Sequence, residues 1–149
     1  MLLTHAGATL ALVGLIWTIQ VVHYPLFAKV GGEAFHTYEQ AHVSRVTLVV
    51  APLMFVELLC ALAIVAMRPA GVSPGLAWTG FALLAIVWIS TATLQGPMHG
   101  RLASLGVCDP KTHSALVSTN WIRTVAWSAR GGIALAMLWQ GARATMAGS

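Results

Sequence analysis

Four segments of the chain are long and apolar enough for a helix to cross a membrane, and they constrain the fold most strongly. A bilayer core about 30 Å thick needs about 20 mostly apolar residues in a helix. Residues 6–27, 46–67, 76–94 and 120–140 meet that need. Membrane strands would be about half as long and strictly alternating, which these segments are not. The sequence predicts an all-α, integral membrane four-helix bundle, with residues 1–149 as a single four-span domain.

The scarcity of charge supports this assignment. Charged residues make up 8% of the chain, whereas soluble domains carry about 25%. Such a chain cannot cover a water-facing surface, so the lipid bilayer is the expected surrounding. The 8 basic residues are scattered rather than clustered, so nucleic acid is not expected as a partner.

Capping signals predict that the second and fourth helices begin before their apolar cores. The glycine pair at 31–32 ends the first turn, and Asp109-Pro110 has the pattern of an N-cap followed by proline at the first helical position. The two helices would then cover residues 33–67 and 110–140. At 1.5 Å per residue each exceeds about 45 Å, so both are expected to extend beyond the bilayer on one side.

Two prolines are expected to shape the spans. Pro97 has no amide hydrogen and is predicted to end the third helix within QGPMHG. Pro52 lies inside the second helix and is predicted to kink it near Leu48.

Titratable residues gather at one end of the predicted bundle. Four antiparallel spans put both longer connections, 28–45 and 95–119, on the same membrane side. Of the six histidines, only His5 belongs to the other side. This asymmetry predicts a site at one membrane face to which all four helices contribute.

The spacing of the histidines on the second helix suggests a metal site. Glu39 and His42 form the Glu-x-x-His pattern that helical bundles use for di-iron and di-manganese centres, and His36 precedes them by one turn. Imidazole and carboxylate together suit iron, zinc or manganese. Only one such motif is present, so other histidines would have to complete the shell. The expected metal ligands are His23, His36, Glu39, His42, His99 and His113. Alternatively, these histidines are interfacial and hydrogen bonded to headgroups and water.

Two opposite charges lie at nearly the same predicted depth, Glu57 in the second span and Arg130 in the fourth. A charge at mid-membrane costs about 2.5 kcal/mol or more, so the two are expected to pair inside the bundle. The pair is either purely structural or the floor of a polar cavity entered from the histidine side. In the second interpretation Glu57, Arg123 and Arg130 are catalytic, and the arginines orient an anionic or quinone-like group.

Two short motifs carry a resemblance to known proteins. HYPLF closes the first span and NWIRT opens the last. In these motifs the chain is similar to small bacterial four-helix membrane proteins and resembles the anthrone-oxygenase-like superfamily. The resemblance implies an oxidative activity on a hydrophobic aromatic substrate, and the expected location is the bacterial cytoplasmic (inner) membrane. The motif positions are His23, Tyr24, Pro25, Asn120, Trp121 and Arg123.

These features favour one function and leave two others open. The favoured hypothesis is a membrane-embedded, metal- or cofactor-dependent oxidoreductase. It would act on a hydrophobic or quinone-like small molecule at a His/Glu/Arg-lined cavity near one membrane face. The expected cofactor-binding residues are His23, Asn120 and Trp127, although Trp127 is also a candidate for core packing. One alternative is a b-type haem electron carrier with His23 as an axial ligand. The other is an oligomeric small-molecule or ion transporter, or an accessory subunit of a larger membrane complex, with Glu57–Arg130 as its gate.

Overall fold

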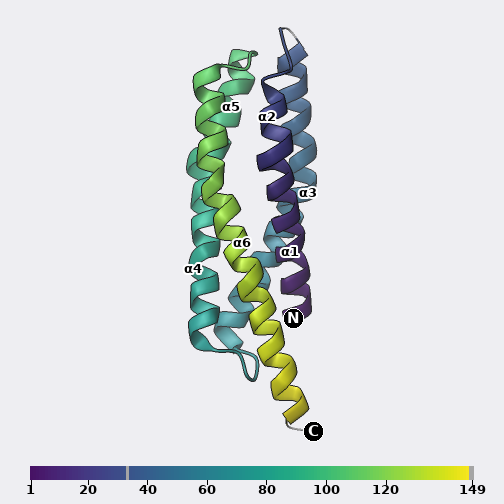
Figure 1. Cartoon of the computed structure of the whole chain (residues 1–149), viewed down its shortest axis with the longest axis vertical. Coiled ribbons are helices and arrows are strands. Elements are labelled where there is room, and N and C mark those ends of the chain that lie inside the picture. Colours follow the sequence, from purple (N-terminus) through teal and green to yellow (C-terminus); the bar gives the residue numbers. More distant parts are fainter. Residues whose placement is uncertain (33, 148–149) are drawn as a thin grey trace.

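Figure 1 shows the computed structural model of the chain, which describes residues 1–32 and 34–147. Every regular element in this described part is helical, which confirms the all-α prediction. Consecutive elements join into four helical rods that run alternately up and down the bundle. The rods are α1 (Leu2–Thr18), η1 (Ile19–His23) and α2 (Tyr24–Phe27); α3 (Ala34–Met67); α4 (Pro74–Ser90), η2 (Thr91–Gln95) and α5 (Gly96–Leu105); and α6 (Pro110–Ala147).

The rods pack as a four-sided bundle. The α1 helix contacts both α3 and α6, and α4 contacts the same two neighbours from the opposite side. Three rods are long and apolar enough to cross a membrane: Leu2–Phe27, Ala34–Met67 and Pro74–Leu105. Their outer faces carry large apolar side chains, for example Leu48 at 76% exposure and Ile89 at 61%. Such a surface suits lipid better than water.

The third rod does not end at Pro97, contrary to the prediction. The π-helical segment η2 (Thr91–Gln95) directly precedes α5, and Pro97 occupies the first turn of α5. A wider π turn relieves the clash between the proline ring and the preceding carbonyls, and the first turn needs no donor from proline. The first rod has the same arrangement: the π-helical segment η1 (Ile19–His23) directly precedes the helical turn that contains Pro25. Residues 95–105 are therefore helix rather than connection.

The early starts of the second and fourth helices are confirmed. The α3 helix is helical from Ala34, while the predicted first residue, Glu33, lies outside the described residues. The α6 helix begins at Pro110 and runs to Ala147, beyond the predicted end. With 34 and 38 residues these helices are about 51 and 57 Å long. Pro52 lies inside α3, which stays helical through it.

Asp109 caps the start of α6. Its Oδ2 accepts hydrogen bonds from the Thr112 hydroxyl (2.6 Å) and the Thr112 amide (2.9 Å). These hydrogen bonds hold the pKa of Asp109 below its ordinary value of 3.8. The ionised carboxylate therefore stabilises the folded state above pH 3.8, and this contribution is lost as the pH falls through the lower, folded-state pKa.

Replacement of this cap gives a pH-dependent prediction. We expect Asp109→Ala to lower the midpoint of thermal unfolding at pH 7, because it removes both the cap and its charge. The difference from the wild type should narrow at a second pH well below 3.8, as the wild-type carboxylate protonates. Circular dichroism melts of the detergent-purified variant and wild type at both pH values would measure the difference between their unfolding midpoints. An equal difference at the two pH values would contradict this account.

Candidate functional site

A cavity of about 620 Å³ opens where α3 faces η2 and α5. This is the size of a small-molecule site. Apolar side chains of α3, including Val43, Val46 and Val50, form much of its wall. Its polar groups come from all four rods: Tyr24 from α2, His42 from α3, Thr91, Gln95 and His99 from η2 and α5, and Arg123 from α6. The predicted convergence of the four helices at one end is therefore present.

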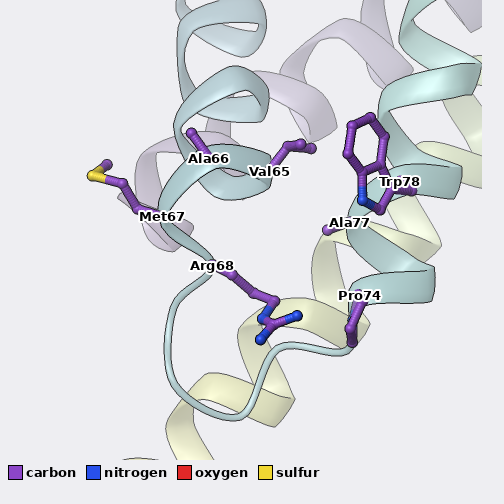
Figure 2. A pocket seen from close by; sticks show the side chains of 7 residues that line it. All are labelled: Val65, Ala66, Met67, Arg68, Pro74, Ala77 and Trp78. Atoms are coloured by element: carbon purple, nitrogen blue, oxygen red, sulfur yellow. The ribbon is translucent and has the colours of Figure 1, made fainter.

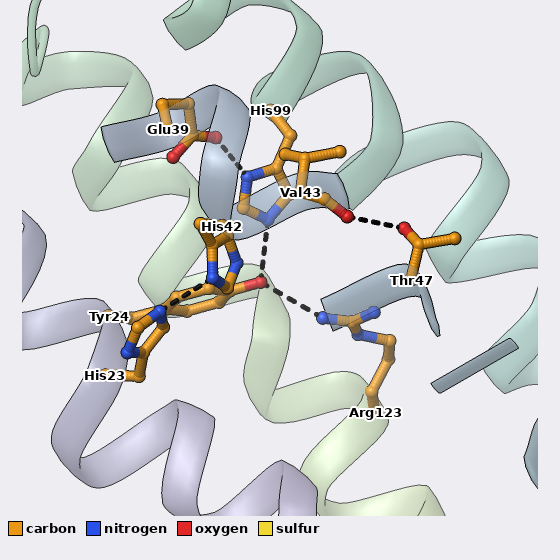
Figure 3. A network of polar contacts seen from close by, with 8 residues as sticks. All are labelled: His23, Tyr24, Glu39, His42, Val43, Thr47, His99 and Arg123. Carbon is orange, nitrogen blue, oxygen red and sulfur yellow. Dashed lines mark hydrogen bonds and ion pairs between the residues drawn. The ribbon is translucent and has the colours of Figure 1, made fainter. Parts of the chain in front are cut away.

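A continuous chain of hydrogen bonds reaches the wall of this cavity (Figure 3). Glu39 Oε1 lies 2.5 Å from His99 Nδ1. The other ring nitrogen of His99, Nε2, lies 3.0 Å from the Tyr24 hydroxyl. The same hydroxyl lies 3.3 Å from Arg123 Nη2. A carboxylate, an imidazole, a phenol and a guanidinium are thus joined in series.

The donor and acceptor roles follow from the chemistry of the groups. An ionised carboxylate only accepts, so His99 Nδ1 donates to Glu39. A neutral His99 then accepts at Nε2 from the Tyr24 O–H, and the Tyr24 oxygen accepts from Arg123. This order makes the Tyr24 hydroxyl a proton donor to a base that a buried carboxylate orients. It is the arrangement by which enzymes activate a hydroxyl group.

Glu39 depends on His99 for its stabilisation. Its side chain is fully buried, and Oε2 has no hydrogen-bond partner in the described part of the chain. The contact with His99 is the only ion pair of Glu39 among the described residues. A proton that His99 accepts would place a positive charge directly beside this buried carboxylate.

Arg123 is held rigidly at the cavity wall. Asn120 Oδ1 accepts hydrogen bonds from Arg123 Nε (2.9 Å) and Nη2 (2.5 Å). Asn120 in turn donates to Gln20 Oε1 (2.7 Å), and Gln20 donates to the Val117 carbonyl (3.1 Å). The predicted site residues Asn120 and Arg123 therefore belong to the cluster, and the i, i+3 spacing on α6 brings them together.

His23 and His42 form a separate hydrogen-bonded pair at the site. His23 Nε2 and His42 Nδ1 are 2.7 Å apart, and the two rings lie on either side of the gap between the first rod and α3. Phe27 packs edge-on against both rings. His42 lines the cavity, and its Nε2 has no hydrogen-bond partner within the described ranges. This nitrogen is therefore free to contact a ligand.

Two of the predicted metal ligands lie apart from this cluster. His36 bonds the Ala103 carbonyl (3.0 Å) and Gln40 (3.0 Å), while His113 bonds the Tyr24 carbonyl (2.8 Å). Within residues 1–32 and 34–147, no group of three or more His, Cys, Asp or Glu side chains is arranged to hold a metal ion. Two nitrogens on one metal would each lie about 2.0–2.1 Å from it, and the hydrogen-bonded His23–His42 pair would have to separate to admit one.

Glu57 and Arg130 form the predicted buried ion pair. Arg130 Nε donates to Glu57 Oε1 at 2.9 Å, and both side chains are almost fully buried. The Thr9 hydroxyl donates to Oε1 (2.9 Å) and Trp127 Nε1 donates to Oε2 (3.1 Å). Arg130 also donates to the Gly80 carbonyl. Trp127, predicted to bind a cofactor, belongs to this deep cluster and to the apolar core.

This ion pair does not form the floor of the cavity, which was one of the two interpretations that its sequence positions left open. Neither Glu57 nor Arg130 lines the cavity. An apolar layer separates the two polar clusters. On each of the four rods, the residues of this layer lie in sequence between a member of one cluster and a member of the other. The layer consists of Leu12, Ile16, Met54, Val87, Ala126 and Trp127.

Reasoning from residue patterns missed three members of the polar clusters. Tyr24 was predicted only as a motif position, yet its hydroxyl joins His99 to Arg123. Thr9 and His5 were given no role, although Thr9 bonds Glu57 and His5 Nε2 lies 3.3 Å from Arg130 Nη2. The available signal for Tyr24 was its position beside His23 at the polar end of the first span.

A second cavity, of about 290 Å³, lies at the opposite end of the bundle around the connection between α3 and α4 (Figure 2). Arg68 is the one ionisable side chain in its described lining, and Trp78 and Met67 are the large apolar ones. No acid or base among these lining residues could exchange a proton with a ligand. The cavity beside His99 is therefore the stronger candidate for a functional site.

No protein-family model, curated protein or solved structure matches this chain. The geometry of the cavity and of its hydrogen-bonded network is therefore the basis on which a function is assigned.

Proposed function

We propose that the protein is an integral membrane oxidoreductase, located in the bacterial inner membrane. Its substrate would be a hydrophobic, quinone-like or phenolic small molecule that binds in the cavity beside His99. The observation that carries this proposal is the Glu39–His99–Tyr24–Arg123 chain, which ends at the cavity wall. The resemblance of HYPLF and NWIRT to the anthrone-oxygenase-like superfamily points to the same class of substrate.

The outer surface of α6 supports a four-span arrangement. Its buried arginines, Arg123 and Arg130, face the bundle, whereas its exposed positions include large apolar side chains. These are Trp121, Ile122, Val125, Leu135 and Trp139. Charges inside and apolar groups outside are the distribution that lipid requires. The fourth rod would then cross the bilayer beside the other three, and α3 and α6, each longer than the core, would extend beyond it.

The network would act as a proton relay at a ligand hydroxyl. The Tyr24 oxygen would take the hydroxyl proton of the ligand while the Tyr24 O–H passes to His99 Nε2. His99 would become an imidazolium paired with Glu39. Arg123 would stabilise the oxyanion that forms on the ligand, as buried cations do at developing negative charge.

Oxidation of a quinol or phenol also requires an acceptor for its electrons. A metal ion (iron, zinc or manganese was predicted from the ligand types) or another redox cofactor would supply that chemistry when bound. Of these, iron and manganese can change oxidation state, whereas zinc cannot. His42 Nε2, which faces the cavity without a partner in the described part of the chain, is the available protein ligand. The residues described above would provide the proton transfer, the binding and the exclusion of water.

A blocked cavity tests the proposal directly. A Cβ at Gly100, which lines the cavity, would meet no atom of another helix within 4 Å, so Gly100→Leu should place a bulky side chain at the cavity wall without moving the backbone. We expect this variant to lose most of the oxidation of a decyl-substituted quinol, by about tenfold or more. Formation of the quinone would be followed by absorbance, with ferricyanide as electron acceptor. Elemental analysis and an optical spectrum of the same preparation would identify any metal or haem.

Gly132→Leu is the matched control. Gly132 is an exposed helical glycine on α6, its added Cβ also meets nothing within 4 Å, and it does not line the cavity. This variant should keep wild-type activity. The proposal fails if the purified protein oxidises none of a panel of hydrophobic quinols and phenols, with or without added iron or manganese. It also fails if the two leucine variants are equally active.

A further inference from the structure

Arg123 is a buried cation without a carboxylate partner in residues 1–32 and 34–147. Of the three acidic side chains in the described part of the chain, Glu39 pairs with His99, Glu57 pairs with Arg130, and Asp109 caps α6. No carboxylate oxygen in this part lies within 4.0 Å of the Arg123 guanidinium. The partners of Arg123 are the neutral oxygens of Asn120, Tyr24 and Thr91. Arg123 is nevertheless only 7% exposed.

The guanidinium retains a free edge toward the cavity. Arginine has five N–H donors, and four of them have acceptors here. Nε and one Nη2 hydrogen bind Asn120, the other Nη2 hydrogen binds Tyr24, and one Nη1 hydrogen reaches Thr91 at 3.4 Å. This leaves one Nη1 hydrogen without an acceptor among the described residues. Both Arg123 and Thr91 line the cavity, so this edge is open to a ligand.

Arg130 has the kind of carboxylate partner that Arg123 lacks among the described residues. The two arginines lie two turns apart on α6 and both are buried, but among the described residues only Arg130 has a carboxylate partner. A buried charge is costly unless an opposite charge compensates it, which the protein achieves for Arg130 and not for Arg123. Because Arg123 lines the cavity, a ligand there is placed to supply the compensating charge.

We propose that the ligand of this cavity is a monoanion, with a carboxylate or phenolate oxygen on an apolar body. This inference rests on the proposed function in one respect, that the cavity is the ligand site, and it adds the charge of the ligand. The anionic oxygen contacts the free Nη1 edge of Arg123, and a second oxygen of a phenolic ligand, still protonated, is the one whose proton the Tyr24 relay takes. The apolar body lies along the valines of α3, and its far end leaves through the opening between α3 and α5.

The His42 ring lies in the same wall and suits this orientation. When no metal occupies this nitrogen, Nε2 can donate to a second oxygen of the ligand head while Nδ1 accepts from His23. A head group with two oxygens, such as a carboxylate or a hydroxyquinone, would then bridge Arg123 and His42. Arginine in particular favours such planar oxygen anions.

Matched pairs of ligands test the charge. The probes are decanoate against decan-1-ol, and an alkyl hydroxynaphthoquinone against its methyl ether. Isothermal titration calorimetry on the full-length protein in lipid nanodiscs, with empty nanodiscs as the blank, would measure affinity. We expect the wild type to bind each anion about tenfold or more tightly than its neutral partner. Tighter binding of the quinone anion than of decanoate would assign a phenolate head, and the reverse a carboxylate head.

Arg123 variants locate the interaction. Arg123→Gln should lower the affinity for the anions by about tenfold or more and change that for the neutral partners by less than about threefold. Arg123→Lys keeps the charge and should give an intermediate affinity for the anions. Arg101→Gln removes an exposed positive charge from α5 outside the cavity lining and should change little. Should the glutamine variant not fold, the lysine variant and the wild-type ligand pairs still decide the question.

The possible outcomes separate this inference from the proposed function. Equal binding of anions and neutral partners to the wild type, or anion binding that survives in Arg123→Gln, overturns the monoanion. Neutral quinols could then still be oxidised, which would leave the proposed function intact. Conversely, Arg123-dependent binding of decanoate in a protein that oxidises no quinol would support the monoanion and reject the oxidoreductase.

Discussion

Glu57→Gln is expected to destabilise the protein by about 3–5 kcal/mol, the cost of breaking a buried ion pair by removing one partner. Arg130 would remain buried at 1% exposure with no carboxylate beside it. The hydrogen bonds from Thr9 and Trp127 would lose their charged acceptor at the same time. Thermal or denaturant unfolding of the purified protein in detergent, followed by circular dichroism, would measure the loss.

The double variant Glu57→Gln/Arg130→Met separates the charge from the packing. Methionine removes the uncompensated cation and keeps a long apolar side chain in the same space, so part of the lost stability should return. The cavity beside His99 lies on the other side of the apolar layer, and its ligand affinity should therefore change little in the double variant. A single variant within about 1 kcal/mol of the wild type would show that Arg130 does not depend on this carboxylate.

Tyr24→Phe is expected to lower the rate of catalysis by about 10²–10⁴-fold, the usual contribution of a positioned acid–base group. The ring and its packing against Phe27 remain, while the hydroxyl that connects His99 to Arg123 is lost. The effect should fall on kcat more than on KM, because the relay acts as the proton moves. Steady-state quinol oxidation in detergent would measure both parameters.

Tyr38→Phe is the matched control for this variant. Tyr38 is the only other tyrosine in the chain, is half-buried on α3, packs against Phe27 and does not line the cavity. Its phenylalanine variant should keep wild-type kinetics.

Glu39→Gln tests the far end of the relay and should reduce kcat while leaving ligand affinity near the wild-type value, because Glu39 orients His99 without lining the cavity. Equal kinetics in Tyr24→Phe and the wild type would remove Tyr24 from the mechanism.

Local signals in the sequence predicted much of the helical framework. The start of α6 follows from Asp109-Pro110, because an N-cap and a first-turn proline act within one turn of the chain. The continuation of the third rod through Pro97 did not follow. The η2 segment that precedes this proline is a π turn, and no residue type marks it.

The site was predicted in composition but only partly in membership. Depth along each helix can be counted from the sequence, and this placed Glu39, His42, His99 and Arg123 at the same end of the bundle. The direction of each side chain around its helix axis cannot be counted in the same way. It depends on the rotation of the whole helix against its neighbours, and the π turns change that rotation within the first and third rods.

The sequence by itself determined the helical class, the four helical rods and the pairing of Glu57 with Arg130. These follow from the lack of charge, from the length of each apolar run and from the cost of a lone charge inside a bundle. Only the tertiary structure decided that Tyr24 joins His99 to Arg123, that His36 and His113 bond backbone carbonyls instead of the cluster, and that an apolar layer separates two polar clusters. Each of these depends on contacts between helices distant in sequence, which are fixed when the four rods pack and not before.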